Sequence, residues 1–127
     1  MTEAFISRPV RSAAILTTSY VAGTVLTDCQ KFNALILNID FTKGSLTDAQ
    51  IKIEVSTDGT TYRQLLSDSI SAGVNSVAGL VYKLTANTAG STTPLTIATK
   101  YIKISAIGTG TVTSSSLAIE AVLAVID

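Results

Sequence analysis

Apolar residues recur at every second position in several segments of the chain, and this period constrains the fold more than any other feature. Three segments show it most clearly: NALILNIDF (33–41), QIKIEV (50–55) and KYIKISA (100–106). Successive side chains of a β-strand point to opposite faces, so this alternation predicts strands with one buried face and one polar face. No long stretch of the sequence repeats apolar residues at the helical period. We therefore predict an all-β fold.

Further strands are predicted where short apolar and β-branched runs lie between Gly, Asp, Asn and Ser. These runs are residues 12–20, 60–66, 78–85 and 116–126, and the polar stretch 86–96 is predicted to be a surface loop. Short strands with turn residues between them are typical of an antiparallel β-sandwich, here expected to be jelly-roll-like. A chain of 127 residues is long enough for one such domain.

The first eleven residues differ from the rest of the chain. They contain Pro9 and three charged residues. Proline restricts the backbone and removes a hydrogen-bond donor, which favours an extended segment outside the core. We predict that residues 1–11 form an extended N-terminal arm and that residues 12–127 form a single β-sandwich domain.

Charged residues are scarce in this sequence. They make up 14% of the chain, against about 25% in an average soluble protein. Nine basic residues balance nine acidic ones and form no basic cluster, so nucleic acid is not an expected partner. The most apolar segment, LAIEAVLAVI, is too short to span a membrane and contains Glu120. We expect no membrane partner, and we interpret the low charge as that of a subunit that covers its surface with neighbours.

The last predicted strand is apolar on both faces. Leu117, Ile119, Ala121, Leu123 and Val125 alternate with Ala118, Val122, Ala124 and Ile126. An antiparallel strand of this kind needs cover on its second face, from the flank of the other sheet or from another subunit. We therefore predict that Val122, Ala124 and Ile126 mediate self-association.

The sequence offers little for catalysis or for metal binding. It contains no histidine and a single cysteine, Cys29, which excludes Ser-His-Asp triads, Cys-His dyads and cysteine-cluster zinc sites. The lone thiol cannot form a disulfide within the chain. We predict no catalytic residue, no cofactor, no metal site and no small-molecule substrate.

The stretch STDGTTYRQL (56–65) places several oxygen atoms around a glycine, as an ion-binding loop does. A calcium loop of the EF-hand kind needs several carboxylates, and only Asp58 is available here. Asp-Gly after an alternating run is a strong hairpin signal, because glycine adopts positive φ without a steric penalty. We therefore predict a tight structural turn at Asp58 and Gly59, whose side-chain oxygens bond their own backbone.

Aromatic residues leave one further function open. Sugar-binding sites use aromatic platforms, and the chain has four tyrosines but no tryptophan. Carbohydrate binding through Tyr20, Tyr62, Tyr82 or Tyr101 is therefore kept as an alternative.

The segment FNALILNIDFTKGSLTDAQIKIEVSTDGTTYRQL resembles small β-sandwich virion proteins of tailed bacteriophages, in which a strand, a Leu-Thr loop and a second strand lead into Ser-x-Asp-Gly-x-x-aromatic. The later segment KYIKISAIGTGTVTSSSLAIEAVLA is similar to their second signature, an apolar strand, a Gly-Thr turn and an apolar closing strand. The resemblance covers residues 31–127. Tyr62 departs from it, because tryptophan is common at that position.

The resemblance implies a non-enzymatic structural protein of the virion, assembled in the host cytoplasm. Capsid decoration (cement) proteins of this type usually bind the shell as trimers and stabilise it. The expected partners are other copies of the chain and the major capsid protein or other virion proteins. We expect the arm to dock on the shell through Phe5, Ile6, Arg8, Pro9 and Arg11. A tail, collar or baseplate component is an alternative within the same class.

Overall fold

The computed structural model describes residues 4–126. Residues 1–3 of the predicted arm and residue 127 of the predicted domain lie outside this range. Twelve strands and one short 3-10 helix make up the described chain: β1 (Ala4–Ala14), β2 (Val21–Ala22), η1 (Cys29–Lys31), β3 (Ala34–Thr42), β4 (Leu46–Ser56), β5 (Arg63–Gln64), β6 (Leu66–Ser71), β7 (Val74–Gly79), β8 (Val81–Leu84), β9 (Thr88–Ser91), β10 (Leu95–Thr96), β11 (Tyr101–Gly110) and β12 (Ser116–Val125).

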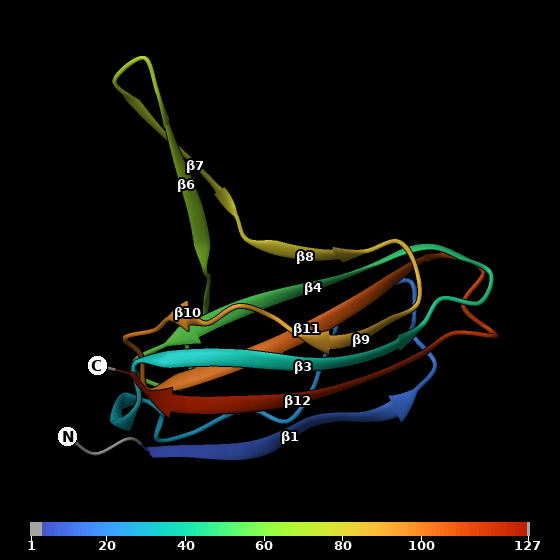
Figure 1. Cartoon of the computed structure of the whole chain (residues 1–127), viewed down its shortest axis with the longest axis horizontal. Helices are drawn as coiled ribbons and strands as arrows, with labels where there is room; N and C mark the ends of the chain where they lie inside the picture. The colour runs from blue at the N-terminus through green and yellow to red at the C-terminus, as the bar shows by residue number, and fades with distance from the viewer. Residues whose placement is uncertain (1–3, 127) are drawn as a thin grey trace.

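Two antiparallel sheets pack face to face (Figure 1). The first sheet has the order β1-β12-β3, and the short strands β9 and β10 both pair with the outer edge of β3. The second sheet has the order β2-β11-β4, and β5 and β8 both pair with the outer edge of β4. The prediction of an all-β antiparallel sandwich is confirmed.

The alternating residues form the core between the sheets. Leu35 and Leu37 of β3 are fully buried, as are Ile51 and Ile53 of β4 and Ile102 of β11. These strands pair directly with β12 or with each other, so alternate residues of neighbouring strands face the same core. Four of the five residues on the inner face of β12 are buried as well: Leu117, Ile119, Ala121 and Leu123. The fifth, Val125, is half-buried at the end of the strand.

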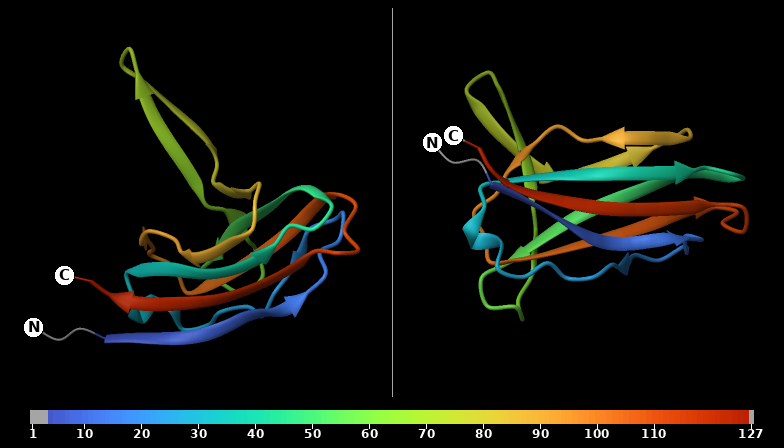
Figure 2. Two further views of the ribbon diagram at one scale, coloured as in Figure 1. Left: turned by 45° about the vertical axis from the view of Figure 1, so that its right-hand side comes forward. Right: turned by 60° about the horizontal axis from the view of Figure 1, so that its bottom comes forward.

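The predicted separate arm is corrected by the structure. Residues 4–14 form β1, an edge strand that pairs antiparallel with β12 over most of its length (Figure 2). Proline is tolerated in an edge strand because only one side of such a strand needs its donors. Pro9 lies opposite Glu120, next to a shift in register between Pro9 and Arg11. Residues 4–11 therefore belong to the sandwich, since β12 offers them a long apolar partner.

Other differences concern the strand ends. The strand predicted over residues 12–20 ends at Ala14, and the predicted loop 86–96 contains β9 and β10. The largest difference from the prediction is the hairpin of β6 and β7, which projects away from both sheets (Figure 1). Within residues 4–126 the structure has no helix with the length and hydropathy needed to cross a membrane.

Candidate interaction surfaces

The two sets of interaction residues predicted from sequence meet on one side of the first sheet. Phe5 of β1 lies directly opposite Ala124 of β12, and Ser7 lies opposite Val122. Val122 in turn lies opposite Ile36 of β3. Residues opposite each other in an antiparallel pair share a face, so Phe5, Ala124 and Val122 lie on the same outer face. Two surfaces that are separate in the sequence are thus continuous in the fold.

This outer face exposes apolar side chains at the end of the sheet where the termini lie. Phe5 is 76% exposed and Ile126 is 48% exposed, while Val122 and Ala124 are half-buried. Beside Ile126 lies an open hollow of about 540 Å³, lined also by Asn33, Ala34, Pro94, Leu95 and Thr96. We call Val122, Ala124 and Ile126, with this hollow, the β12 outer face.

The other predicted docking residues are partly engaged within the fold. The guanidinium of Arg8 donates to the carbonyl of Thr27 at 2.8 Å. Arg11 donates to the carbonyls of Leu117, Ala14 and Ile15 at 2.9, 3.1 and 2.8 Å, and partial burial lowers its pKa. These arginines therefore tie β1 to neighbouring segments, whereas Phe5, Ile6 and Pro9 stay exposed.

The projecting hairpin of β6 and β7 is inserted between β5 and β8, the two short strands that pair with the outer edge of β4. Gln64 pairs with Glu54, and the amide of Leu65 donates to the carbonyl of Ile53 at 2.8 Å. Val81 then pairs with Lys52, the next residue of β4. Residues 66–80 therefore leave and re-enter the edge without disturbing its register. The amide of Leu80 donates to the carbonyl of Leu65 at 2.9 Å and closes the base of the hairpin.

The hairpin exposes every residue of its two strands. Asp68 pairs with Val77 and Ile70 with Asn75, so Leu66, Ile70 and Val77 share one face, where they are 55%, 75% and 62% exposed. A hydrogen bond of 3.2 Å from the Asn75 amide to the Asp68 carboxylate lies on the same face. The opposite face is made of small or β-branched residues: Ser67, Ser69, Ser71, Val74, Ser76 and Ala78. This hairpin was not predicted from the sequence, where the alternation of Leu66, Asp68 and Ile70 with serines signals a strand.

The turn around Asp58 bonds its own backbone. The carboxylate of Asp58 accepts hydrogen bonds from the amides of Thr60 and Thr61, both at 2.8 Å, and from the Ser56 hydroxyl at 2.9 Å. The Ser56 hydroxyl also accepts from the amide of Gly59 at 2.9 Å. These donors lower the pKa of Asp58, with the Thr61 and Thr60 amides contributing most. The turn is longer than the predicted tight one, because residues 57–62 connect β4 to β5.

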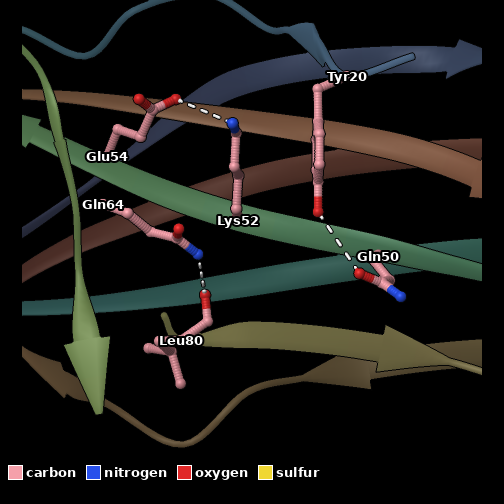
Figure 3. Close-up of polar contacts among 6 residues, drawn as sticks. All are labelled: Tyr20, Gln50, Lys52, Glu54, Gln64 and Leu80. Atoms are coloured by element: carbon pink, nitrogen blue, oxygen red, sulfur yellow. Dashed lines mark hydrogen bonds and ion pairs between the residues drawn. The ribbon is translucent and has the colours of Figure 1, made fainter. Parts of the chain in front are cut away.

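The four tyrosines do not form one shared platform. Lys52 lies over the ring of Tyr20 and Lys103 over the ring of Tyr62, each 4.3 Å from the ring centroid. Figure 3 shows Tyr20 on the outer face of the second sheet beside Lys52, Glu54 and Gln50. Lys100 lies 5.6 Å from the ring centroid of Tyr101. Tyr82 instead packs against the core, where burial raises its pKa.

The reactive groups of the described chain do not gather into a site. Cys29 is fully buried, and this burial raises the pKa of its thiol. Within residues 4–126, no three His, Cys, Asp or Glu side chains lie close enough together to hold a metal ion. Asp48 is buried, and its carboxylate lies 3.6 Å from the ammonium of Lys83. Exposed apolar residues of the described chain are found on the β12 outer face, on β1 and on the hairpin.

No protein-family model matches the chain, and no curated protein sequence matches it. A solved structure is similar in fold. A chain in the structure of the infectious bursal disease virus Gx strain is 10% identical, with a TM-score of 0.51, and the match covers 97% of this chain and 32% of that one. A chain in the crystal structure of the infectious bursal disease virus VP2 subviral particle is 11% identical, with a TM-score of 0.47, over 97% of this chain and 33% of that one.

This chain therefore spans about a third of the length of the virus chains that it resembles. Identity of this order shows a similar fold and no more. The chain is similar in fold to a portion of a protein found in a virus structure.

Proposed function

We propose that the protein is a non-enzymatic structural component of a virus particle. The observation that carries this proposal is the continuous apolar surface of the first sheet, where exposed Phe5 lies beside the half-buried Ala124 and Val122. Exposed contiguous apolar surface marks interaction sites, and a subunit in a particle covers such surface against its neighbours. The fold likeness to a virus chain supports the same conclusion.

The finer proposal is a capsid decoration protein of a tailed bacteriophage, which the sequence resemblance implies. In this proposal the exposed residues of β1 contact the major capsid protein or another virion protein: Phe5 and Pro9 from the outer face and Ile6 from the edge of the sheet. The β12 outer face serves self-association, and a trimer is the preferred state. Localisation is then in the virion, after assembly in the host cytoplasm.

Immunogold electron microscopy of purified particles tests this function directly. The particles would come from the virus that encodes the chain, and the antibody would be raised against the purified protein. Regular label over the shell is the expected result. Label at a tail, collar or baseplate would move the protein to the alternative position, and absence of label would overturn the virion proposal.

A substitution tests the docking side of β1. Phe5→Lys places a charge on a side chain that is 76% exposed, so folding should be retained. We expect this variant to be lost from particles while its melting temperature stays at the wild-type value. Normal incorporation of the variant would show that Phe5 is not part of the docking surface.

A further inference from the structure

The hairpin of β6 and β7 is dispensable for the sandwich by its geometry. Leu65 and Val81 would continue one strand along β4 if residues 66–80 were absent, because their partners Ile53 and Lys52 are consecutive. The alternation also continues, since Leu65, Tyr82 and Leu84 pack against the core. The hairpin therefore adds nothing to the packing of the two sheets.

The hairpin also has little intrinsic stability as an isolated element. A two-stranded hairpin is at best marginally stable in water, and this one projects away from the sandwich in Figure 1 and in the left view of Figure 2. Its turn holds Ala72 at φ 51° and Gly73 at φ 79°, as a two-residue hairpin turn with positive φ at both positions requires. Alanine is disfavoured in this region. A segment of this kind gains stability when another surface covers it.

The chemistry of the hairpin favours an apolar, weakly charged partner surface. Leu66, Ile70 and Val77 gather on one face together with Asp68, which is hydrogen-bonded to Asn75 and is the one charged residue of the fourteen in β6, β7 and their turn. A polyanion or an anionic lipid surface would need basic residues, which these fourteen lack. The β12 outer face has the matching character, with an open hollow between Ile126, Leu95 and Pro94.

The size of the hairpin favours a second copy of the chain as the partner. Each side of a standard protein interface contributes about 20–30 residues, and the hairpin supplies at most fourteen, so a single hairpin contact is small. In a closed ring of identical subunits, every copy gives one hairpin and receives another, so each copy contributes twice. Each copy is then held by two contacts, one at its hairpin and one at its β12 outer face, so a contact below the standard size can still hold a closed assembly together.

We propose that the hairpin of one copy packs its Leu66, Ile70 and Val77 face onto the β12 outer face of a second copy. The contact is head-to-tail and closes into a ring. This inference deepens the self-association in the proposed function, but it does not depend on the particle to which the assembly belongs.

Analytical ultracentrifugation of the purified full chain tests the contact at micromolar concentration. We expect the wild type to sediment as an oligomer. The variant Ile70→Lys/Val77→Lys should sediment as a 13.2 kDa monomer with an unchanged circular-dichroism spectrum. The control Ser71→Lys/Ser76→Lys has the same diagonal spacing and charge on the opposite face of the hairpin, and it should remain oligomeric. A monomeric wild type, or an oligomeric Ile70→Lys/Val77→Lys variant, would overturn the proposal.

A mixing experiment tests the head-to-tail geometry. The variant Val122→Lys/Ile126→Lys should be monomeric alone, because its receiving surface is lost while its hairpin is intact. Mixed with the Ile70→Lys/Val77→Lys variant, it should form a one-to-one dimer through the single remaining pair of good surfaces. Packing of hairpin against hairpin predicts instead that Val122→Lys/Ile126→Lys oligomerises alone, and that result would reject the β12 outer face as the partner.

Cross-linking gives a readout that does not depend on disrupting the contact. The one natural cysteine, Cys29, is fully buried. A chain carrying Ile70→Cys and Ile126→Cys should form disulfides between copies on mild oxidation by molecular oxygen, whereas Ser71→Cys with Ile126→Cys should form far fewer. Equal yields from the two pairs would contradict the predicted orientation of the hairpin. If the hairpin variants are monomeric but still label virus particles, the self-association fails separately from the virion role.

Discussion

Leu65 and Val81 occupy consecutive positions along the edge of β4, although fifteen residues separate them in the chain. The edge strand before the insertion and the strand after it keep one register, so the inner side chains Leu65 and Tyr82 continue to meet the core. A protein edge can carry an insertion of this kind because only one side of the edge strand is used for pairing. The pairing with β4 is therefore complete without residues 66–80, which form the projecting hairpin.

The first prediction follows from this register. Deleting residues 66–80, so that Leu65 is joined to Val81, should leave the sandwich folded and its melting temperature close to that of the wild type. Deleting residues 81–84 is the matched comparison, because it removes Tyr82 and Leu84 from the core and should lower the melting temperature strongly. Thermal denaturation followed by circular dichroism measures both, and an unfolded 66–80 deletion would show that the hairpin supports the fold.

The second prediction concerns Gly59, which has φ 79°. A side chain at this position takes on an unfavourable backbone conformation, and its Cβ would lie 3.2 Å from the ring of Tyr101. We expect Gly59→Ala to lower the free energy of unfolding by about 1–2 kcal/mol. Gly90→Ala is the control, because its φ is ordinary and no heavy atom lies within 4 Å of its added Cβ. Urea denaturation of both variants measures their free energies of unfolding. Equal values would contradict the backbone strain expected at Gly59.

The third prediction is a pH dependence at Asp58. The backbone amides of Thr61 and Thr60 and the Ser56 hydroxyl lower the pKa of this carboxyl in the folded protein. A carboxyl with a lowered folded pKa adds stability that is complete above its unfolded pKa and is lost as the pH falls through the folded pKa. The wild type should therefore melt above Asp58→Asn at neutral pH, and the difference should shrink in acid.

The amide side chain of the Asp58→Asn variant would still offer an acceptor oxygen, so the neutral-pH difference reports the charge of the carboxylate rather than the loss of the whole turn. Asp40→Asn provides a control for the loss of one negative charge at an exposed position of β3. Melting temperatures measured from neutral to acidic pH decide the matter. A difference between the wild type and Asp58→Asn that does not vary with pH would contradict the proposed stabilisation.

The fourth prediction compares two neighbours on β3. Leu37 is fully buried between the sheets, whereas Ile36 faces outward and is half-buried. Leu37→Ala should lower the free energy of unfolding by about 2–5 kcal/mol, because it leaves a cavity in the core. Ile36→Ala should have a smaller effect on the isolated subunit. Urea denaturation measures both, and similar losses would mean that the outer face of β3 is more covered than the structure indicates.

Much of the fold follows from local patterns that the sequence displays openly. The alternation in residues 33–41, 50–55 and 100–106 determined the strands and their buried sides, because the side-chain period of a strand is two. The apolar second face of the last strand likewise identified Val122, Ala124 and Ile126 as residues in need of cover, and the Asp58-Gly59 pair marked a turn. These features depend on residues close together in the chain, so the sequence by itself determined them.

Tertiary structure alone decided the rest. Residues 4–11, with Pro9 and two arginines, were not predicted to form a strand, and they become one because β12, more than a hundred residues away, offers an edge with which to pair. The same pairing places Phe5 opposite Ala124 and joins two predicted surfaces into one. Only the unbroken register of Leu65 and Val81 on β4 shows that the hairpin of β6 and β7 is an insertion outside the core. Pairing between distant strands depends on geometry summed over the whole chain, which no local pattern encodes.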